Sequence, residues 1–353
     1  MSAPQRDKGL QLNQDFHLLL NDGHSMPVIA LGTFSPNILP YEAAEQNWMS
    51  VSDVESSDTL DQSDIDTVKE AVKIALDVGY RHIDCAYIYR TEKGIGQVFQ
   101  EKFEEGKLKR EDVFYTTKLW GTFHQPHLVR PALEKSLAFL QMKYVHLFII
   151  HFPISLQPGD KLFPVDENGM ALLDYVDLQQ TWEAMEKCKD AGLAKSIGVS
   201  NFTCQLLELI LNKPNLKYKP VCNQVECHPY LTQKKLLEFC KSHDIVLTAY
   251  GVVGSPTAGR WVDEKCPAIL QDPVLISIGE KYKKSAAQVS IRYMIQRGCV
   301  PIVKSFHPDH IRQNFQVFDF HLSSEDMDAI DKLNKNMHYW KYLAWERHPN
   351  HHF

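Results

Sequence analysis

Four side chains that can carry protons or charge stand at or just after the ends of successive apolar runs. Asp84, Lys118 and His151 each end or follow one run, and Tyr89 comes soon after Asp84. A buried lysine paired with an aspartate stays cationic, and a cation beside a phenol lowers the pKa of that phenol. A tyrosine tuned in this way can protonate a carbonyl oxygen while a neighbouring histidine orients it. Together the four predict an acid–base centre for carbonyl reduction, although each alone is more often a core residue or part of a buried ion pair.

Eight apolar runs alternate with stretches of helical periodicity, which predicts strands separated by helices. The predicted strands are Val28–Leu31, Tyr80–Asp84, Val113–Leu119, Val145–Ile150, Lys195–Ser200, Val221–Glu226, Ile245–Ala249 and Val300–Val303. The predicted helices are Asp66–Val78, Glu92–Glu105, Pro126–Gln141, Leu178–Ala191, Leu206–Asn212, Gln233–His243, Ser285–Gln296 and His307–Phe315, with Ser324–Leu333 as an extra C-terminal helix. Such strands imply an α/β protein whose parallel sheet is covered on its outer face. Eight units favour a closed (β/α)8 TIM barrel over an open sheet.

The chain is expected to form a single barrel domain over residues 1–353, with three additions. Residues 16–29 are predicted to form a hairpin around Asn21-Asp22-Gly23 that plugs the lower end of the barrel. Residues 35–64 form an atypical insertion, too long for an ordinary βα loop, which is either a disordered surface segment or a lid on the catalytic face. Residues 335–353 are expected to form a C-terminal substrate loop.

Composition and charge argue against several function classes. Of 353 residues, 44% are hydrophobic and 23% are charged, and the net charge of −6 predicts no affinity for nucleic acid or anionic membranes. The polar N-terminus lacks the apolar stretch of a signal peptide, and no apolar run is long enough to span a bilayer. Eight scattered cysteines without metal-site spacing predict reduced thiols, no metal and a cytoplasmic protein.

Three motifs carry a family resemblance. They are Gly79-Tyr80-Arg81-His82-Ile83-Asp84, Lys195-Ser196-Ile197-Gly198-Val199-Ser200-Asn201-Phe202 and Asn223-Gln224-Val225-Glu226-Cys227-His228-Pro229. From about Leu18 to Tyr339 the chain resembles the aldo-keto reductases, specifically the vertebrate hydroxysteroid dehydrogenase and prostaglandin F synthase group. The resemblance implies an enzyme, most often a monomer, that reversibly reduces steroid, prostanoid or xenobiotic ketones and aldehydes with NADPH.

The resemblance also implies catalytic roles. Tyr89 would be the acid, Lys118 and Asp84 would tune it, and His151 would orient the carbonyl. Related 5β-reductases carry Glu at the position of His151, so the histidine favours carbonyl reduction over reduction of a conjugated double bond. Lens crystallins are similar to this family, so a structural or ligand-binding protein with weak or no catalysis is the alternative.

The cofactor is expected at the last strands, because barrels bind phosphates through their final loops and a helix N-terminus. No glycine-rich dinucleotide motif lies between a strand and a helix, and Gly94-Ile95-Gly96 falls inside a predicted helix. Lys304 and Ser305 could hold a 2′-phosphate, which favours NADP(H). By resemblance, the cofactor-binding residues are Thr33, Asp84, Ser200, Asn201, Gln224, Tyr250, Val253, Ser255, Lys304, Ser305, Phe306, His310, Gln313 and Asn314.

Within this set, each part of the cofactor has its own residues. The carboxamide would be bound by Ser200, Asn201 and Gln224, and the nicotinamide ring would stack on Tyr250. The pyrophosphate or ribose would be lined by Thr33, Val253 and Ser255, and the adenine by Gln313 and Asn314.

Three positions depart from the family pattern. His310 replaces an arginine that contacts the 2′-phosphate, and because a neutral imidazole cannot replace a fixed bidentate cation, selectivity against NADH should narrow. Gly251 replaces a serine beside Tyr250, which loosens a backbone position near the pyrophosphate. His146 replaces an aspartate at the start of a strand and is expected to be a surface change.

The predicted substrate pocket is apolar and aromatic. It consists of Phe34, Ile88, Trp120, His151, Phe152, Trp261 and Trp340, with Tyr339, Leu343 and Trp345 from the tail. Large rings around a few polar groups suit a flat apolar carbonyl or alcohol. Phe152 stands where the aldose reductase branch carries Trp, which favours the steroid-type branch. The tail histidines His348, His351 and His352 are expected to be solvated.

Overall fold

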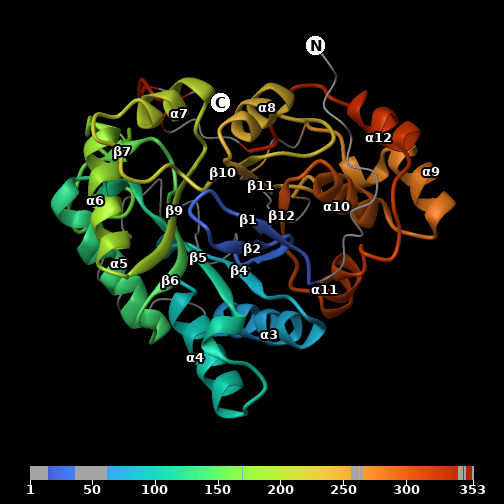
Figure 1. Cartoon of the computed structure of the whole chain (residues 1–353), viewed down its shortest axis with the longest axis horizontal. Coiled ribbons are helices and arrows are strands. Elements are labelled where there is room, and N and C mark those ends of the chain that lie inside the picture. The colour runs from blue at the N-terminus through green and yellow to red at the C-terminus, as the bar shows by residue number, and fades with distance from the viewer. Residues whose placement is uncertain are drawn as a thin grey trace.

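Eight parallel strands close into a barrel (Figure 1). The computed structural model describes residues 15–35, 62–168, 170–255, 262, 265–340, 345 and 347–351. In their order around the barrel, the strands are β3 (Ala30–Gly32), β4 (His82–Asp84), β5 (Phe114–Leu119), β6 (Val145–Ile150), β9 (Ala194–Ser200), β10 (Cys222–Glu226), β11 (Val246–Tyr250) and β12 (Val300–Val303). Each overlaps one predicted strand, so the predicted (β/α)8 barrel is confirmed.

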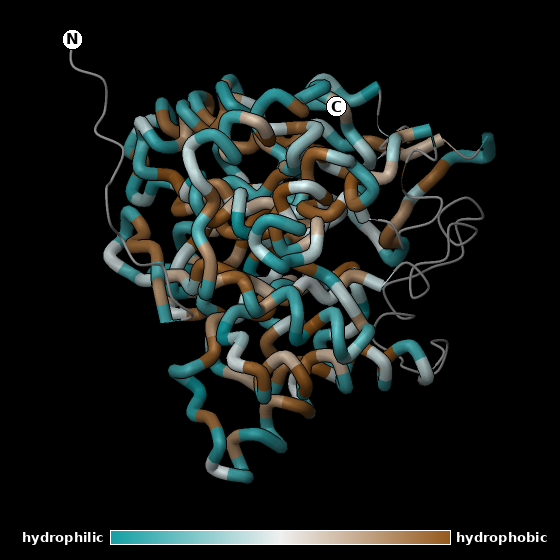
Figure 2. The backbone as a smooth tube through the Cα atoms, turned by 90° about the vertical axis from the view of Figure 1, so that its right-hand side faces the viewer, coloured by the Kyte–Doolittle hydropathy of each residue, from teal (hydrophilic) through white to brown (hydrophobic). Residues whose placement is uncertain are grey.

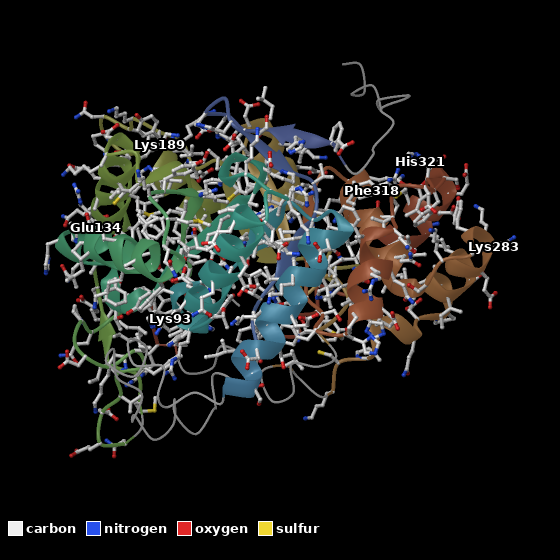
Figure 3. All side chains as sticks on the ribbon, turned by 90° about the horizontal axis from the view of Figure 1, so that it is seen from below. Lys93, Glu134, Lys189, Lys283, Phe318 and His321 are labelled. Atoms are coloured by element: carbon white, nitrogen blue, oxygen red, sulfur yellow. The ribbon has the colours of Figure 1, made fainter. Side chains whose placement is uncertain are left out.

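Helices surround the strands (Figure 1). They are α3 (Gln62–Val78), α4 (Glu92–Glu104), α5 (Pro126–Leu140), α6 (Leu178–Asp190), α7 (Cys204–Leu211), α8 (Lys234–Ser242), α9 (Pro273–Tyr282), α10 (Ala286–Gln296), α11 (Pro308–Phe315) and α12 (Ser324–Asp331). Each buries an apolar stripe, which leaves much of the outer chain hydrophilic (Figure 2). The exposed side chains of Glu134 and Lys283 lie at opposite edges of the molecule (Figure 3). No described helix is long and apolar enough to cross a bilayer.

Two helices differ from the prediction. Helix α9 is missing from the predicted elements, although Asp272 caps it by accepting a hydrogen bond from the Val274 amide (2.9 Å) and Pro273 occupies its first position. Helix α3 begins at Gln62, so residues 62–64 of the predicted insertion are helical. Residues 36–61 of that insertion lie outside the described part of the chain.

The predicted N-terminal hairpin is present and consists of β1 (His17–Leu19) and β2 (Ser25–Pro27). It lies across the end of the barrel where the strands begin (Figure 1), and its residues Leu20 and Met26 pack there in an apolar cluster. In its turn, Asp22 accepts hydrogen bonds from Lys189 Nζ (2.5 Å) and Ser196 Oγ (2.8 Å). Burial raises the pKa of Asp22, but these hydrogen bonds lower it more, so that it lies below its ordinary value.

A second hairpin, not predicted, lies between β6 and α6. It is formed by β7 (Ser155–Leu156) and β8 (Leu173–Asp174). The tail folds back onto it: His348 is 4% exposed and its Nε2 lies 3.2 Å from the Asp174 carbonyl oxygen. The expectation that His348 is solvated is therefore wrong, because this hairpin provides a surface that covers it.

Candidate active site

A buried ion pair between β4 and β5 anchors the site. Lys118 Nζ lies 2.6 Å from Oδ1 of Asp84 and 2.7 Å from the carbonyl oxygen of Cys85. Gln224 Nε2, on β10, donates to the other carboxylate oxygen of Asp84 at 2.8 Å. Both charged side chains are almost fully buried. Removing either partner of this pair would leave an uncompensated buried charge. The network therefore holds the ammonium of Lys118 at a fixed position at the C-terminal end of the strands.

Tyr89 follows β4 on a short 3-10 turn, η2 (Tyr87–Tyr89), which ends at Arg90 in the left-handed conformation (φ 60°). Its hydroxyl lies 3.5 Å from Lys118 Nζ. Burial raises the pKa of the Tyr89 phenol well above its ordinary value, and the negative charge of Asp84 raises it further. The predicted lowering of this pKa is not found, because burial and the charge of Asp84 both raise it. The phenol therefore stays protonated at neutral pH.

His151, directly after β6, completes the group. Its ring centre lies 5.7 Å from that of Tyr89, at an interplanar angle of 77°. Burial lowers the pKa of His151 well below its ordinary value, and the charge of Lys118 lowers it further. Its buried Nδ1 has no hydrogen-bond partner within the described residues. A protonated phenol and a neutral imidazole on one side of the barrel mouth can both donate to a carbonyl oxygen.

The residues predicted to bind the nicotinamide end lie beside this group. Ser200 Oγ donates to the Gln224 carbonyl oxygen at 2.8 Å, and Asn201 Nδ2 donates to the His151 carbonyl oxygen at 2.9 Å. The hydroxyl of Tyr250 donates to Oδ1 of Asn201 at 2.8 Å. An array of amides and hydroxyls next to an aromatic ring fits a flat heterocycle carrying a carboxamide.

The predicted phosphate-binding residues follow β12. Lys304 is half-buried, and burial lowers the pKa of its ammonium to about 8. Ser305 Oγ accepts a hydrogen bond from the His307 amide (3.1 Å), and the ring of His310 lies 4.7 Å from that of His307, centre to centre. Arg312, on the same helix, pairs with Asp309 at 3.6 Å. A cation and two imidazoles beside the start of α11 fit an anionic group.

The remaining predicted cofactor residues are spread over three places. Thr33 is buried, and its hydroxyl donates to the Asp84 carbonyl oxygen at 2.9 Å. Ser255, on the loop after β11, has a positive φ of 49°, and Val253 of the same loop packs on the core. Phe306 lies 5.2 Å from Lys304 Nζ, measured to its ring centre. Gln313 and Asn314 lie on α11; of these two side chains, that of Asn314 is buried and that of Gln313 is exposed.

The aromatic residues predicted for the substrate pocket form two groups. Phe34 lies 5.3 Å from Tyr89 and 5.5 Å from Trp340, between ring centres. Trp120 and Phe152 lie next to His151 and are covered by Trp345, at 5.9 Å and 4.9 Å respectively. A small hollow is lined by Trp120, Gly121, Phe152, Ile154, Leu156 and Trp345. Ile88 is 1% exposed within the core, and Trp261 and Leu343 lie outside the described residues.

One buried cluster has no predicted role. Glu226, at the end of β10, accepts hydrogen bonds from His228 Nε2 (3.0 Å), His338 Nδ1 (3.1 Å) and the Tyr339 amide (2.7 Å). Burial raises the pKa of Glu226, but these hydrogen bonds lower it more, so that it lies below its ordinary value. A carboxylate at a strand end, two residues before a histidine, is the signal that could have identified it. Among the described residues no group of three or more His, Cys, Asp or Glu could hold a metal ion.

Comparison with known proteins agrees with this geometry. Residues 52–335 match the model of the aldo/keto reductase family. The chain is 52% identical to human aldo-keto reductase family 1 member C3, over 94% of this chain and 95% of that protein. It is 53% identical both to a 3-alpha-hydroxysteroid dehydrogenase of Rattus norvegicus and to prostaglandin F synthase 1 of Bos taurus, over 95% of this chain and 96% of each relative. The chain belongs to the aldo/keto reductase family and is an oxidoreductase that acts on carbonyl groups with a nicotinamide cofactor.

Proposed function

We propose that this protein uses NADPH to reduce ketones and aldehydes on bulky apolar molecules, such as steroids, prostanoids or xenobiotics, and catalyses the reverse oxidation. The observation that carries the proposal is the meeting of Tyr89, Lys118 and His151 at one end of the barrel, with Tyr89 hydroxyl and Lys118 ammonium 3.5 Å apart. Two relatives named for a hydroxysteroid and a prostaglandin support this substrate class.

Tyr89 is the proton donor in this mechanism. When bound, the nicotinamide supplies hydride to the carbonyl carbon. The raised pKa of Tyr89 keeps its proton in place until charge develops on the carbonyl oxygen. Lys118 then stabilises the phenolate that is left, while Asp84 holds the lysine at a fixed position. The neutral imidazole of His151 orients the oxygen by a hydrogen bond.

NADP(H) would be held along the ends of β9 to β12. Ser200, Asn201 and Gln224 would bind the carboxamide, and Tyr250 would stack on the ring. The preference for NADPH would come from Lys304 and its neighbours. Since burial lowers the pKa of Lys304 to about 8, a bound 2′-phosphate would be needed to keep it fully charged above that pH.

The substrate would enter between the two aromatic groups. Phe34 and Trp340 would lie on one side of it, and Trp120, Phe152 and Trp345 on the other. In this arrangement the tail, residues 335–353, acts as the substrate loop of a single barrel domain. We propose that the enzyme works as a monomer in the cytoplasm. The cytoplasmic location is supported by the eight cysteines, which all lie in the described part of the chain and form no disulfide there.

The test compares the wild-type protein with Tyr89→Phe. Turnover of a generic carbonyl such as phenanthrenequinone, and of a panel of steroids and prostaglandins, is followed by NADPH consumption. Tyr89→Phe should lose nearly all turnover while it still binds NADPH, measured by quenching of protein fluorescence. Wild-type rates in the variant would rule out the assigned acid. Ligand binding without NADPH consumption by the wild type would point instead to a binding protein.

A further inference from the structure

In the loop after β11, Gly251 lies close to the side chain of Trp340. Gly251 has a φ of 69°, a conformation that favours glycine. A β-carbon built on it would lie 3.5 Å from both Nε1 of Trp340 and Cγ of Glu226, and 3.7 Å from Oγ of Ser255. The resemblance predicts a serine at position 251, so this chain lacks that hydroxyl and has an indole N–H beside the same backbone.

The indole N–H of Trp340 is a buried donor that finds no acceptor among the described residues. Its Nε1 is inaccessible to solvent and makes no hydrogen bond within the described part of the chain. Buried donors in folded proteins nearly always have a partner, and an exception indicates a ligand or an ordered water. By contrast, the other buried indoles are satisfied: Trp120 Nε1 donates to the Leu162 carbonyl oxygen (2.6 Å) and Trp182 Nε1 to that of Tyr218 (3.0 Å).

The position of Trp340 is fixed by its surroundings. Its ring meets those of Phe34 and Tyr250 edge to face, at 5.5 Å and 6.2 Å between centres. The preceding residue, Tyr339, is held by its amide on Glu226, and Trp340 itself forms a β-bridge with Val262. The donor is therefore held in place before any ligand arrives, which lowers the entropic cost of using it.

We propose that Trp340 binds the cofactor: its indole N–H donates a hydrogen bond to a pyrophosphate oxygen, in place of the side chain that Gly251 lacks. The inference rests on the proposed use of NADPH. Nε1 lies beside Gly251, and the ring of Trp340 meets that of Tyr250, so the donor lies next to residues on or just after β11, where the proposed cofactor site lies. The ring of Trp340 faces Phe34 on the proposed substrate side, whereas its Nε1 lies beside Gly251. An anionic oxygen is the strongest acceptor available to a neutral donor.

The first test measures binding by isothermal titration calorimetry. Trp340→Phe keeps an aromatic ring and removes the N–H, so NADPH should bind about tenfold more weakly, as expected for loss of a hydrogen bond to a charged group. Adenosine 2′,5′-bisphosphate, which lacks the pyrophosphate, should bind the variant and the wild type equally. The matched control Trp345→Phe should leave NADPH affinity within about twofold of wild type. Equal NADPH affinity in Trp340→Phe, or equal weakening of both ligands, would overturn the inference.

The second test observes the donor directly in the wild-type protein. In a ¹H–¹⁵N spectrum of the six tryptophan indoles, the Trp340 signal is identified by its loss in Trp340→Phe. Saturation with NADPH should move this signal downfield and slow its exchange with water, and adenosine 2′,5′-bisphosphate should do neither. An unmoved signal in NADPH-saturated protein contradicts the inference and leaves the proposed function intact. If wild-type protein binds no NADPH at all, both are wrong.

Discussion

The ammonium of Lys118 lies 2.6 Å from Asp84 and 3.5 Å from the hydroxyl of Tyr89, so one buried cation serves both a structural partner and the proposed acid. Lys118→Met should therefore affect stability as well as turnover. The uncompensated Asp84 carboxylate should lower the unfolding free energy by about 3–5 kcal/mol, as for other broken buried pairs. Urea denaturation measures this change in unfolding free energy. In activity assays, kcat/KM should fall by about 100-fold. The double variant Lys118→Met with Asp84→Asn should regain part of the stability but none of the turnover; a double variant no more stable than the single one would contradict this account.

His310 offers a change that should improve cofactor binding. Its exposed ring lies against His307, near Lys304, and provides no fixed charge. His310→Arg should tighten NADPH binding about tenfold, because an arginine forms charge-assisted bonds with a phosphate. The affinity for NADH, which lacks the 2′-phosphate, should not change. Equal gains for both cofactors, measured by fluorescence titration, would place the phosphate elsewhere.

The strands could be predicted from the sequence because each is a short apolar run that becomes buried on both faces. In β5, for example, all six residues from Phe114 to Leu119 are buried. The positions of Asp84, Lys118 and His151 followed from the rule that parallel barrel strands present their C-terminal ends on one face. Helix α9 was not predicted because its apolar residues lack a distinct helical period, although Asp272 and Pro273 mark its start.

Tertiary contacts account for what the sequence could not predict. The direction of the Tyr89 pKa shift depends on how deeply the phenol is buried and on how close Asp84 lies to it, and both are known only once the chain is folded. The burial of His348 likewise depends on a hairpin whose strands have two residues each. The proximity of Trp340 to Gly251 is likewise a tertiary contact, because nothing in the sequence around Trp340 indicates that it lies beside Gly251.

Buried histidines should make the fold sensitive to acid. Burial lowers the pKa values of His82, His124 and His146 to about 3 each, so His146 is not the simple surface change expected from the sequence. Because the unfolded chain binds protons to these groups below its ordinary histidine pKa and the native state does not, their stabilisation is complete above about pH 6.5 and is lost as pH falls towards 3.

Urea unfolding at about pH 7 and pH 5 should accordingly show a loss of roughly 1–2 kcal/mol for each buried imidazole. His146→Asn removes one titrating group, and its loss over the same interval should be smaller by about that amount. Identical pH dependence for His146→Asn and wild type would mean that His146 is protonated in the native state.

Glu226 should govern how tightly the C-terminal segment closes the substrate site. Its carboxylate binds His338 and the Tyr339 amide, directly before Trp340. Glu226→Ala removes both acceptors, so the Tyr339 amide should exchange with deuterium about tenfold faster or more, as expected for loss of a hydrogen bond to a charged group. The KM for a bulky apolar ketone should rise several-fold while kcat changes less, since the proton donor is not displaced. Glu238→Ala, an exposed change on α8, is the matched control. Unaltered exchange at Tyr339 in Glu226→Ala would show that other contacts hold the segment, and a drop in kcat without a change in KM would place Glu226 in support of the acid–base group instead.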